Sequence, residues 1–357
     1  MISSLISRCI RCRAPLRIGL AGGGTDLSPY CDIYGGNILN VTIDRYAYST
    51  IKDRSDGLVH FVAIDLEKEE TFEASQQFYY TDGLQLHRVV YQYFMKNYNN
   101  SVYLPLSVIT WIECPYGSGL GGSSALMVSL IGAFLRLFDV NLDKKQIASL
   151  AYTLEREFLA LSGGRQDQYS ASYGGLNYME FCSDNKVIVT PLQISRQTLF
   201  ELEASLLLCF TGVSRSSATI IDEQVNSVQN QNIDTIESFH LLRKNALEMK
   251  FALMNDDLDR LSQLFHDGWQ IKKRSAAGVS NRYIDDLYRK ALDAGAQAGK
   301  ISGAGGGGFM MLLAEPTKKN ELLLFLQSHQ YQVFNCHFTF SGVESWNFMT
   351  KEKGVVA

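Results

Sequence analysis

Apolar and polar positions in the first third of the chain follow the short period of pleated strands. Segments rich in Val, Ile, Tyr, Phe and Thr lie at 36–50 and 58–72, and a further apolar strand is predicted at 104–113. Between them, the apolar spacing of 84–98 predicts a helix. This part of the chain is therefore predicted to form strands joined by turns, with one helix among them.

Helical spacing dominates after residue 122. It covers 123–138 and 143–161, and most of 216–294 has the same spacing. The glycine-bounded segment 295–299 is predicted to end this helical region and to connect it to the third glycine-rich part of the chain. The shorter apolar segments predict strands at 175–180, 186–190, 204–210, 309–313 and 332–341, and a helix at 322–328.

This order of elements predicts an α+β protein built in two layers. At roughly 150 residues per domain, a chain of 357 residues forms two domains or one large one. We place the boundary so that the domains are 1–195 and 196–357, although no linker of distinct composition marks it.

Composition narrows the class of protein. Hydrophobic residues make up 46% of the chain and charged residues 20%, an ordinary globular balance that argues against disorder, collagen and coiled coil. The formal net charge is -4, so no basic surplus points to a nucleic-acid partner. We therefore expect a globular protein that acts on small molecules.

Membrane insertion and secretion are not expected. The longest apolar run, 125–138, is interrupted by Arg136 and is shorter than the roughly 20 residues of a spanning helix. The segment 1–13 lacks the apolar core and cleavage site of a secretory signal. Seven cysteines are an odd number, which favours reduced thiols and a cytoplasmic location. Cys9 and Cys12 form a lone CxxC, which we interpret as the start of a strand rather than a zinc site.

The 29 glycines are concentrated in three clusters, and the middle one is the most informative. Residues 115–125 read PYGSGLGGSSA, after an apolar strand and before a helix. Glycines let the backbone approach a ligand closely, and the N–H groups of a helix start favour an anion. Ser123 and Ser124 have two possible roles, a helix cap or a hydroxyl for a metal-bound phosphate. The cluster predicts phosphate binding.

Other nucleotide motifs fit this segment less well. Gly117, Gly119 and Gly122 satisfy GxGxxG, but a dinucleotide fold needs a second strand after the helix. The segment 143–161 has helical spacing instead. A Walker A loop is also missing, because Gly299 and Lys300 are followed by isoleucine and not by serine or threonine. The protein-kinase signatures are missing too.

The outer clusters add two more loops. Residues 13–26 read RAPLRIGLAGGGTD, a strand-like segment that ends in three glycines, and Thr25 and Asp26 there have side chains that suit a polyhydroxylated ligand. The alternative is an ordinary glycine-rich turn. Residues 300–309 read KISGAGGGGF. Four consecutive glycines have a high conformational entropy, which a loop packed against a phosphate or another backbone would explain.

These three clusters, in this order, resemble the GHMP small-molecule kinase superfamily over 13–341. The middle cluster is similar to its Pro-x-x-x-Gly-Leu-x-Ser-Ser nucleotide loop, although Gly122 stands where many members have the first serine. The segment 13–26, together with GGRQDQ at 163–168, is most similar to the D-glycero-D-manno-heptose 7-phosphate kinases. The resemblance implies a two-domain GHMP kinase fold, with an N-terminal domain like ribosomal protein S5 and a C-terminal α+β domain.

The resemblance also implies roles for single residues. Asp167 corresponds to the catalytic aspartate of galactokinases, which accepts the hydroxyl proton or orients the hydroxyl. Arg17 corresponds to the basic residue beside it; an adjacent guanidinium keeps a carboxylate ionised and steadies a phosphoryl group. Arg165 is a weaker candidate for that task. Glu155 resembles the magnesium-binding glutamate, with Ser123 as its partner ligand.

Further residues are expected to bind the two small molecules. The predicted nucleotide-binding residues are Gly117, Ser118, Gly119, Leu120, Gly121, Gly122, Ser123 and Ser124. The predicted substrate-binding residues are Gly23, Gly24, Thr25, Asp26, Arg215, Gly303, Gly305 and Gly306. A basic run at 272–274 offers an alternative pocket for a sugar phosphate, but we interpret it as a solvated face. Glu157 is a rival of Glu155, and the histidines are interpreted as structural, with His266 the one that suits a cleft.

The function that these residues imply is an ATP- and Mg²⁺-dependent sugar kinase. It is expected to phosphorylate the anomeric hydroxyl of a sugar phosphate, with D-glycero-D-manno-heptose 7-phosphate giving the 1,7-bisphosphate. Alternatives are a fucokinase-like or galactokinase-like hexose 1-kinase, a nicotinamide-dependent oxidoreductase, and a non-catalytic sensor of sugar and ATP. The expected partners are the sugar phosphate and ATP, with neither nucleic acid nor membrane; the sequence leaves homo-oligomer formation, the anomer and the adenine pocket open.

Overall fold

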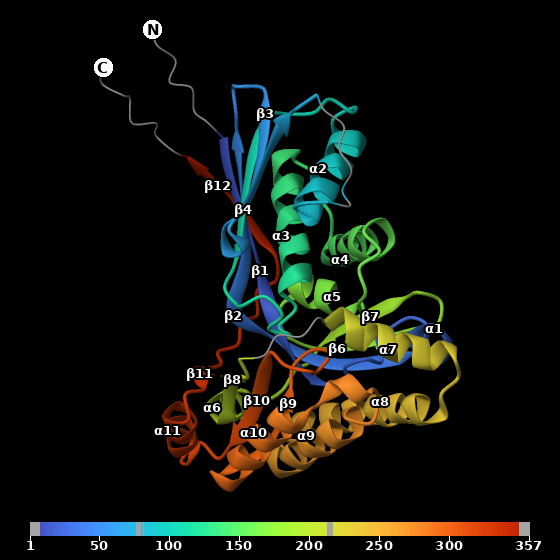
Figure 1. The fold of residues 1–357 in the computed structure, drawn as a ribbon, viewed down its shortest axis with the longest axis vertical. Coiled ribbons are helices and arrows are strands. Elements are labelled where there is room, and N and C mark those ends of the chain that lie inside the picture. The colour runs from blue at the N-terminus through green and yellow to red at the C-terminus, as the bar shows by residue number, and fades with distance from the viewer. Residues whose placement is uncertain (1–7, 76–79, 81, 213–216, 350–357) are drawn as a thin grey trace.

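The computed structural model describes residues 8–75, 80, 82–212 and 217–349. It contains two sheets with helices packed against them, which confirms the α+β class (Figure 1). The smaller sheet and its helices lie below the larger sheet in this view. Within the described ranges, every helix is too short or too polar to cross a bilayer.

The larger sheet is built around the long strand β2. Among the described residues it has eight strands in the order β12-β1-β2-β5-β3-β4, with β6 pairing with β2 and with β7. These strands are β1 (Arg8–Ala21), β2 (Gly36–Asp53), β3 (Leu58–Ala63), β4 (Lys68–Glu73), β5 (Leu106–Ile112), β6 (Leu176–Phe181), β7 (Val187–Pro191) and β12 (Glu344–Met349). The first part of β2 pairs with β6 and its last part with β5, so one strand connects both ends of the sheet.

Helix α3 is the central helix of this domain. Every residue from 124 to 135 is buried, because α3 contacts β1 and β2 on one side and α2, α4 and α5 on others. Figure 1 shows α3 running beside the sheet, with its start toward the smaller domain. The helices here are α1 (Tyr30–Tyr34), α2 (Gln85–Tyr98), α3 (Gly122–Leu137), α4 (Lys144–Tyr152) and α5 (Gln166–Tyr173).

The smaller sheet contains, among the described residues, four strands in the order β11-β8-β10-β9. Its strands are β8 (Leu206–Phe210), β9 (Ala296–Ile301), β10 (Phe309–Ala314) and β11 (Gln332–Asn335). The helices of this part are α6 (Arg196–Ser205), α7 (Ser217–Gln229), α8 (Ile233–Met254), α9 (Leu258–Lys272), α10 (Arg282–Asp293) and α11 (Lys319–Ser328). In α10, Ile284, Leu287, Tyr288 and Ala291 are buried at helical spacing and join the core of this domain.

The connecting segment predicted at 295–299 is confirmed only at Gly295, which lies in the turn after α10, whereas 296–299 belong to strand β9. The strand pairs with β10, and Gly299 lies opposite Leu312. A Cβ at Gly299 would lie 2.7 Å from Leu312 Cδ2, so the close approach of the neighbouring strand requires a small residue here. Small residues alone do not predict a strand; the pairing partner, distant in the sequence, determines it.

Other boundaries differ from the prediction for local reasons. The helix expected over 143–161 is α4 followed by a π-helical turn at Thr153–Phe158, and it ends there. The segment 58–72 divides into β3 and β4, joined by a short 3₁₀ turn at Ile64–Leu66. The lone CxxC lies in β1, where Cys9 and Cys12 are buried free thiols, as the strand interpretation predicts.

The end of the chain returns to the larger sheet. The strand expected at 332–341 ends at Asn335, and β12 then pairs with β1 over 344–349. The segment that precedes β12 also crosses β2, where Thr42 Oγ1 donates to the Thr339 carbonyl at 2.7 Å. The division into 1–195 and 196–357 therefore stays a prediction, with the last strand belonging to the first sheet.

Candidate active site

The second and third glycine clusters pack backbone against backbone. The Phe309 N–H donates to the Ser118 carbonyl at 3.0 Å. Gly119 has φ +75°, and a Cβ there would lie 2.4 Å from the Ser302 carbonyl oxygen. Any side chain at Gly119 would therefore separate the two loops. This confirms the expectation that the third cluster packs against another backbone.

The first cluster joins them through strand β1. The Arg17 N–H donates to the Leu120 carbonyl at 3.0 Å, which ties β1 to the middle cluster. Further along β1, the Leu20 carbonyl accepts a hydrogen bond of 3.0 Å from Nζ of Lys300, the first residue of the third cluster. The three glycine clusters thus lie together, where the two domains meet.

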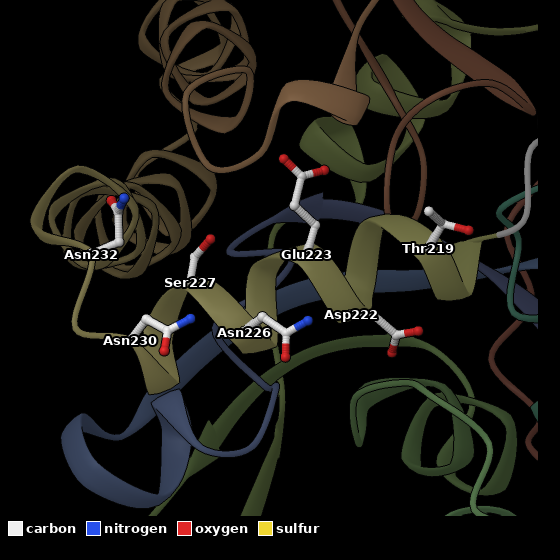
Figure 2. Close-up of a pocket in the computed structure, with 7 residues that line it drawn as sticks. All are labelled: Thr219, Asp222, Glu223, Asn226, Ser227, Asn230 and Asn232. Carbon is white, nitrogen blue, oxygen red and sulfur yellow. The ribbon is translucent and has the colours of Figure 1, made fainter.

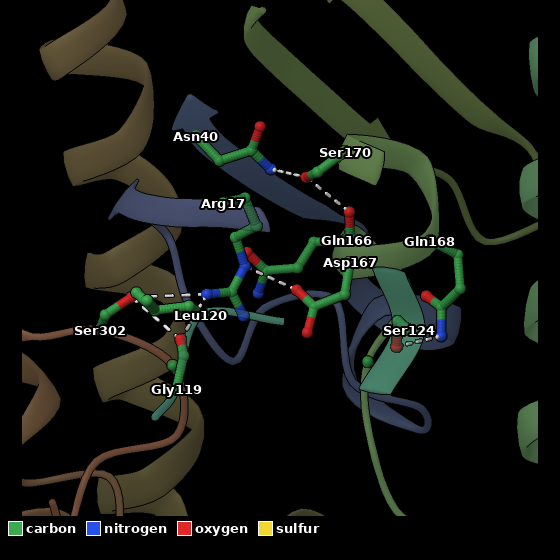
Figure 3. A network of polar contacts seen from close by, with 12 residues as sticks. Arg17, Asn40, Gly119, Leu120, Ser124, Gln166, Asp167, Gln168, Ser170 and Ser302 are labelled. Carbon is green, nitrogen blue, oxygen red and sulfur yellow. Dashed lines mark hydrogen bonds and ion pairs between the residues drawn. The ribbon is translucent and has the colours of Figure 1, made fainter. Parts of the chain in front are cut away.

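Arg17 and Asp167 form an ion pair at this junction (Figure 3). Arg17 Nε donates to Asp167 Oδ1 at 2.7 Å, and the guanidinium also donates to the Gly119 carbonyl at 2.6 Å. The Arg17 side chain is 5% exposed and that of Asp167 is 22% exposed, so the carboxylate remains open to a ligand. A Cβ at Gly121 would lie 3.2 Å from Asp167 Cγ, which places the carboxyl group directly over the predicted nucleotide loop.

Asp167 lies in the first turn of α5, and Asp26 anchors the start of that helix. Asp26 Oδ2 accepts the N–H groups of Arg165 at 2.9 Å and Gln166 at 3.1 Å. Asp26 is almost fully buried, at 1% exposure, and this burial raises its pKa above the ordinary value. The backbone N–H of Gln166 opposes that rise, because it stabilises the charged form. Asp26 therefore fixes the helix that carries Asp167.

This geometry predicts a stability effect for Asp26→Asn. The amide oxygen can still accept both backbone N–H groups, but the negative charge is lost and the amide nitrogen turns a donor toward Gln166 Nε2, which donates to Asp26 Oδ1 at 3.4 Å. We expect the free energy of unfolding to fall by about 1–3 kcal/mol, measured by chemical denaturation without sugar. An unchanged free energy of unfolding, with weaker sugar binding alone, would instead indicate that Asp26 acts only on the ligand.

Glu155 and the two serines of the nucleotide loop form a second polar cluster. Glu155 is 1% exposed and lies in the π-helical turn. It accepts hydrogen bonds from Ser124 Oγ at 2.8 Å and Ser123 Oγ at 3.4 Å, and a short one from Gln168 Nε2. Neither serine caps α3, whose N-cap is Gly121 without a side-chain hydrogen bond among the described residues. Their hydroxyls therefore face Glu155, and the capping interpretation is wrong.

This cluster fits a magnesium ion. Hydroxyl and carboxylate oxygens are the ligands that Mg²⁺ prefers, and it keeps several waters and phosphates besides. Ser123 Oγ and Glu155 Oε1 lie side by side at 3.4 Å beside the start of α3. Within the described ranges, no group of three or more His, Cys, Asp or Glu side chains gathers as a metal site. Ser123 and Glu155 would thus supply two protein oxygens to such an ion, with phosphates and waters as its other ligands.

The sequence-based prediction did not place Lys272 and Lys300 in this junction, although it considered the run 272–274 as a pocket for a sugar phosphate. The interpretation of 272–274 as a solvated face is wrong for Lys272, which is 3% exposed and donates to the Gly303 carbonyl. Lys300 is 5% exposed. Lys273, by contrast, lies 3.4 Å from Asp285 in an ion pair between partly exposed side chains. The last turn of an amphipathic helix gave no indication of which lysine faces inward.

The remaining candidates lie elsewhere or are already bonded. The Thr25 hydroxyl donates to the Asn37 carbonyl at 2.9 Å, so its contact with sugar stays a prediction. Arg165 pairs with Asp32 at 2.9 Å instead of facing the Asp167 carboxylate. Glu157 is exposed, and His266 bonds Tyr288 at 2.6 Å. Residue Arg215 lies outside the described residues.

A separate polar groove of about 710 Å³ runs along α7 (Figure 2). It is lined by Thr219, Asp222, Glu223, Asn226, Ser227, Asn230 and Asn232. Two of its carboxylates are engaged, since Asp222 accepts from Ser162 Oγ at 2.6 Å and Glu223 accepts from the Ala277 N–H at 2.9 Å. None of the predicted site residues that the structure describes lines this groove, so the three glycine clusters remain the candidate site.

A glycine-rich loop at a helix start, an Arg–Asp ion pair with a ligand-accessible carboxylate, and a hydroxyl–carboxylate pair are the features of a phosphotransferase that acts on a hydroxyl group. The family comparison agrees with this class. The model for the GHMP kinases N terminal domain matches residues 85–175, and the model for GHMP kinases C terminal matches residues 249–332. The chain belongs to the GHMP kinase family.

Individual relatives are similar over nearly the whole chain. The D-glycero-alpha-D-manno-heptose 7-phosphate kinase of Campylobacter jejuni is 40% identical over 340 residues, which cover 95% of this chain and 99% of that protein. A crystal structure of a D-glycero-D-manno-heptose 1-phosphate kinase from Bacteroides thetaiotaomicron is 36% identical, with a TM-score of 0.81 and coverage of 96% and 100%. The bifunctional fucokinase/GDP-fucose pyrophosphorylase of Arabidopsis thaliana is 27% identical, and 31% of its length is covered.

Proposed function

We propose that this protein is an ATP-dependent sugar kinase that phosphorylates the anomeric hydroxyl of D-glycero-D-manno-heptose 7-phosphate to the 1,7-bisphosphate. The observation that carries the chemistry is the Asp167 carboxylate, paired with Arg17 at 2.7 Å and lying over the nucleotide loop. The choice of sugar rests on the relative that is 40% identical over 95% of the chain.

The Arg17–Asp167 pair performs two tasks in this proposal. Asp167 accepts the proton of the sugar hydroxyl or orients that hydroxyl. The hydroxyl oxygen forms a bond to the γ-phosphorus of ATP as the bond from that phosphorus to ADP breaks and ADP leaves. Arg17 orients the carboxylate through a charge-assisted hydrogen bond of 2.7 Å. The guanidinium also bonds the Gly119 carbonyl, so it is held rigidly where phosphate charge develops.

The nucleotide loop and the metal pair position the second substrate. The start of α3 presents backbone N–H groups and the positive end of the helix dipole to the phosphates of ATP. Ser123 and Glu155 would hold Mg²⁺, which neutralises part of the phosphate charge when bound. Gln168 and Ser124 keep the Glu155 carboxylate in place through their hydrogen bonds.

A reducing compartment also belongs to this proposal. All seven cysteines lie in the described ranges and are free thiols, five of them buried. Free thiols are typical of proteins of the cytoplasm, where disulfides are kept reduced. A cytoplasmic kinase that meets ATP and a sugar phosphate is consistent with that chemistry.

The experiment that tests this function is a product assay with the purified wild-type protein. ATP and Mg²⁺ are incubated with heptose 7-phosphate, the unphosphorylated heptose, fucose and galactose, and products are identified by mass spectrometry. We expect the bisphosphate and ADP with heptose 7-phosphate, at a kcat/KM at least about tenfold above the other sugars. Faster turnover of fucose or galactose would move the assignment to a hexose 1-kinase, and an unchanged ATP pool with every sugar would contradict a kinase.

A further inference from the structure

The ammonium group of Lys272 lies between two of the glycine clusters. Lys272 is the last residue of α9 and is 3% exposed. Its Nζ donates to the Gly303 carbonyl of the third cluster. It also lies 3.0 Å from the position that a Cβ would take at Gly23, in the first cluster. This side chain therefore reaches from the smaller domain into the junction where sugar and phosphate are expected to meet.

Three cations gather at this junction. Burial, followed by the positive charge of Arg17, lowers the pKa of Lys272 to about 8. Burial, followed by the charges of Lys272 and Arg17, lowers the pKa of Lys300 well below its ordinary value. The pKa of each lysine is thus lowered because the positive charges face one another in a space shielded from water.

The carboxylates nearby are committed to other partners. Asp167 pairs with Arg17, and Asp26 accepts the backbone N–H groups at the start of α5. Among the residues that the structure describes, neither lysine has a carboxylate within ion-pair distance. Three cations face two carboxylates, so one positive charge has no counterpart. An ammonium group that is buried without a counter-charge tends to lose its proton, which is why burial lowers the pKa of both lysines. An anion beside Lys272 would supply the missing counter-charge and stabilise the ammonium form.

Lys272, rather than Lys300, is placed to meet that anion. Lys300 Nζ donates to the Leu20 carbonyl at 3.0 Å and lies 5.6 Å from the centre of the Phe265 ring, which holds it as a tie between the domains. An ammonium group has three donors, and the structure assigns one of those of Lys272 to Gly303. Within the described part of the chain the other two make no hydrogen bond, so they are available to a ligand beside Gly23.

We propose that Lys272 is a phosphate-binding residue, whose ammonium group contacts a phosphate oxygen of the bound substrate between Gly23 and Gly303. This rests on the proposed function, because it assumes that phosphorylated ligands occupy the junction. The same chemistry has two sources, the phosphoryl group at the end of the nucleotide and the phosphate carried by the sugar. Binding measurements with matched pairs of ligands distinguish them.

The test compares Lys272→Met and Lys272→Arg with Lys273→Met, a neighbouring lysine in a partly exposed ion pair. Calorimetry measures the binding of an ATP analogue with an imido bridge against ADP, and of heptose 7-phosphate against the unphosphorylated heptose. In each pair, one ligand carries an additional phosphate. We expect Lys272→Met to weaken the binding of that ligand, in one of the two pairs, by about tenfold or more relative to its partner. Lys272→Arg should restore part of the affinity, and Lys273→Met should change neither pair.

A pH series separates this role from a structural one. Because a deprotonated ammonium carries no charge, the wild-type association constant for that probe should fall as the pH rises above about 8. The charged groups facing Lys272 are Arg17, Asp26 and Lys300. The arginine of Lys272→Arg keeps its charge over the same pH range. Ionisation of the probe and of those groups affects wild type and Lys272→Arg alike, so the difference between their pH profiles reports on Lys272.

Two results would overturn the proposal. The first is that Lys272→Met weakens the binding of both ligands of each pair equally, or weakens neither. The second is that the association constants of wild type and Lys272→Arg depend on pH in the same way. The outcome is independent of the catalytic assay. If the wild-type protein phosphorylates none of the sugars but prefers the ATP analogue over ADP through Lys272, the proposed function fails while this inference stands. If heptose 7-phosphate is phosphorylated and Lys272→Met discriminates neither pair, the inference fails alone.

Discussion

Asp167→Ala is expected to lower kcat by about 10²–10⁴-fold. The side chain that receives or orients the hydroxyl would be lost, while α5 would keep its anchor through Asp26. Asp167→Asn is expected to lower kcat similarly, because an amide keeps the hydrogen bond from Arg17 but loses the charge and the basicity. Single-turnover kinetics with heptose 7-phosphate and ATP would measure both variants.

The control for Asp167 is another acid in the first turn of a helix. Asp259 occupies that position in α9 and is exposed, so Asp259→Asn tests the general effect of losing an acid near a helix start. We expect its kcat to stay within about twofold of wild type, since surface changes of this kind are worth a few tenths of a kcal/mol. Rates near wild type in a folded Asp167→Ala would remove Asp167 from the chemistry.

Glu155→Gln is expected to raise the Mg²⁺ concentration for half-maximal activity by about tenfold or more, because even residues that only support a metal ligand contribute about 10–100-fold. The substitution also removes the buried negative charge that accepts the hydrogen bonds of Gln168 and Ser124. The free energy of unfolding should therefore fall by about 1–3 kcal/mol. Steady-state rates over a Mg²⁺ series, together with chemical denaturation, measure the two effects separately.

Glu157→Gln provides the matched control, two positions further along the same turn and exposed to solvent. It should leave both the Mg²⁺ dependence and the stability unchanged. A loss of stability in Glu155→Gln without any change in the Mg²⁺ dependence would mean that Glu155 only holds the turn against α3. A shifted Mg²⁺ dependence in Glu157→Gln would show that the metal had been assigned to the wrong carboxylate.

Whether a contact of the site could be predicted depended on how far apart its residues lie in the sequence. The predicted nucleotide loop lies within 115–125, where glycines, serines and a helix start are adjacent in sequence, so a local pattern was sufficient to predict the turn and the start of α3. The Arg17–Asp167 pair spans 150 residues, and only the resemblance to a kinase family brought the two together. The role of Asp26 in holding α5 had no local indication, because its partners lie 139 and 140 residues away.

The fold shows the same division. Helices with clear spacing, such as α3 and α10, occur where their apolar positions predict them, since a helix makes its hydrogen bonds locally. Strand β9 was missed, because its small residues become a strand only when β10 supplies the hydrogen bonds. The return of β12 to β1 joins residues more than 300 positions apart, and no local pattern encodes such pairing.

The sequence by itself therefore determined the class of the protein, the three glycine clusters and the family to which they are similar, because each is a local pattern of backbone freedom and helix starts. Tertiary structure alone decided which cations are buried. In the run 272–274 the sequence offers equivalent basic side chains, but packing turns Lys272 into the junction and leaves Lys273 in a partly exposed ion pair. Burial depends on contacts between distant segments, and it is burial that lowers the pKa of Lys272 and distinguishes it from its neighbour.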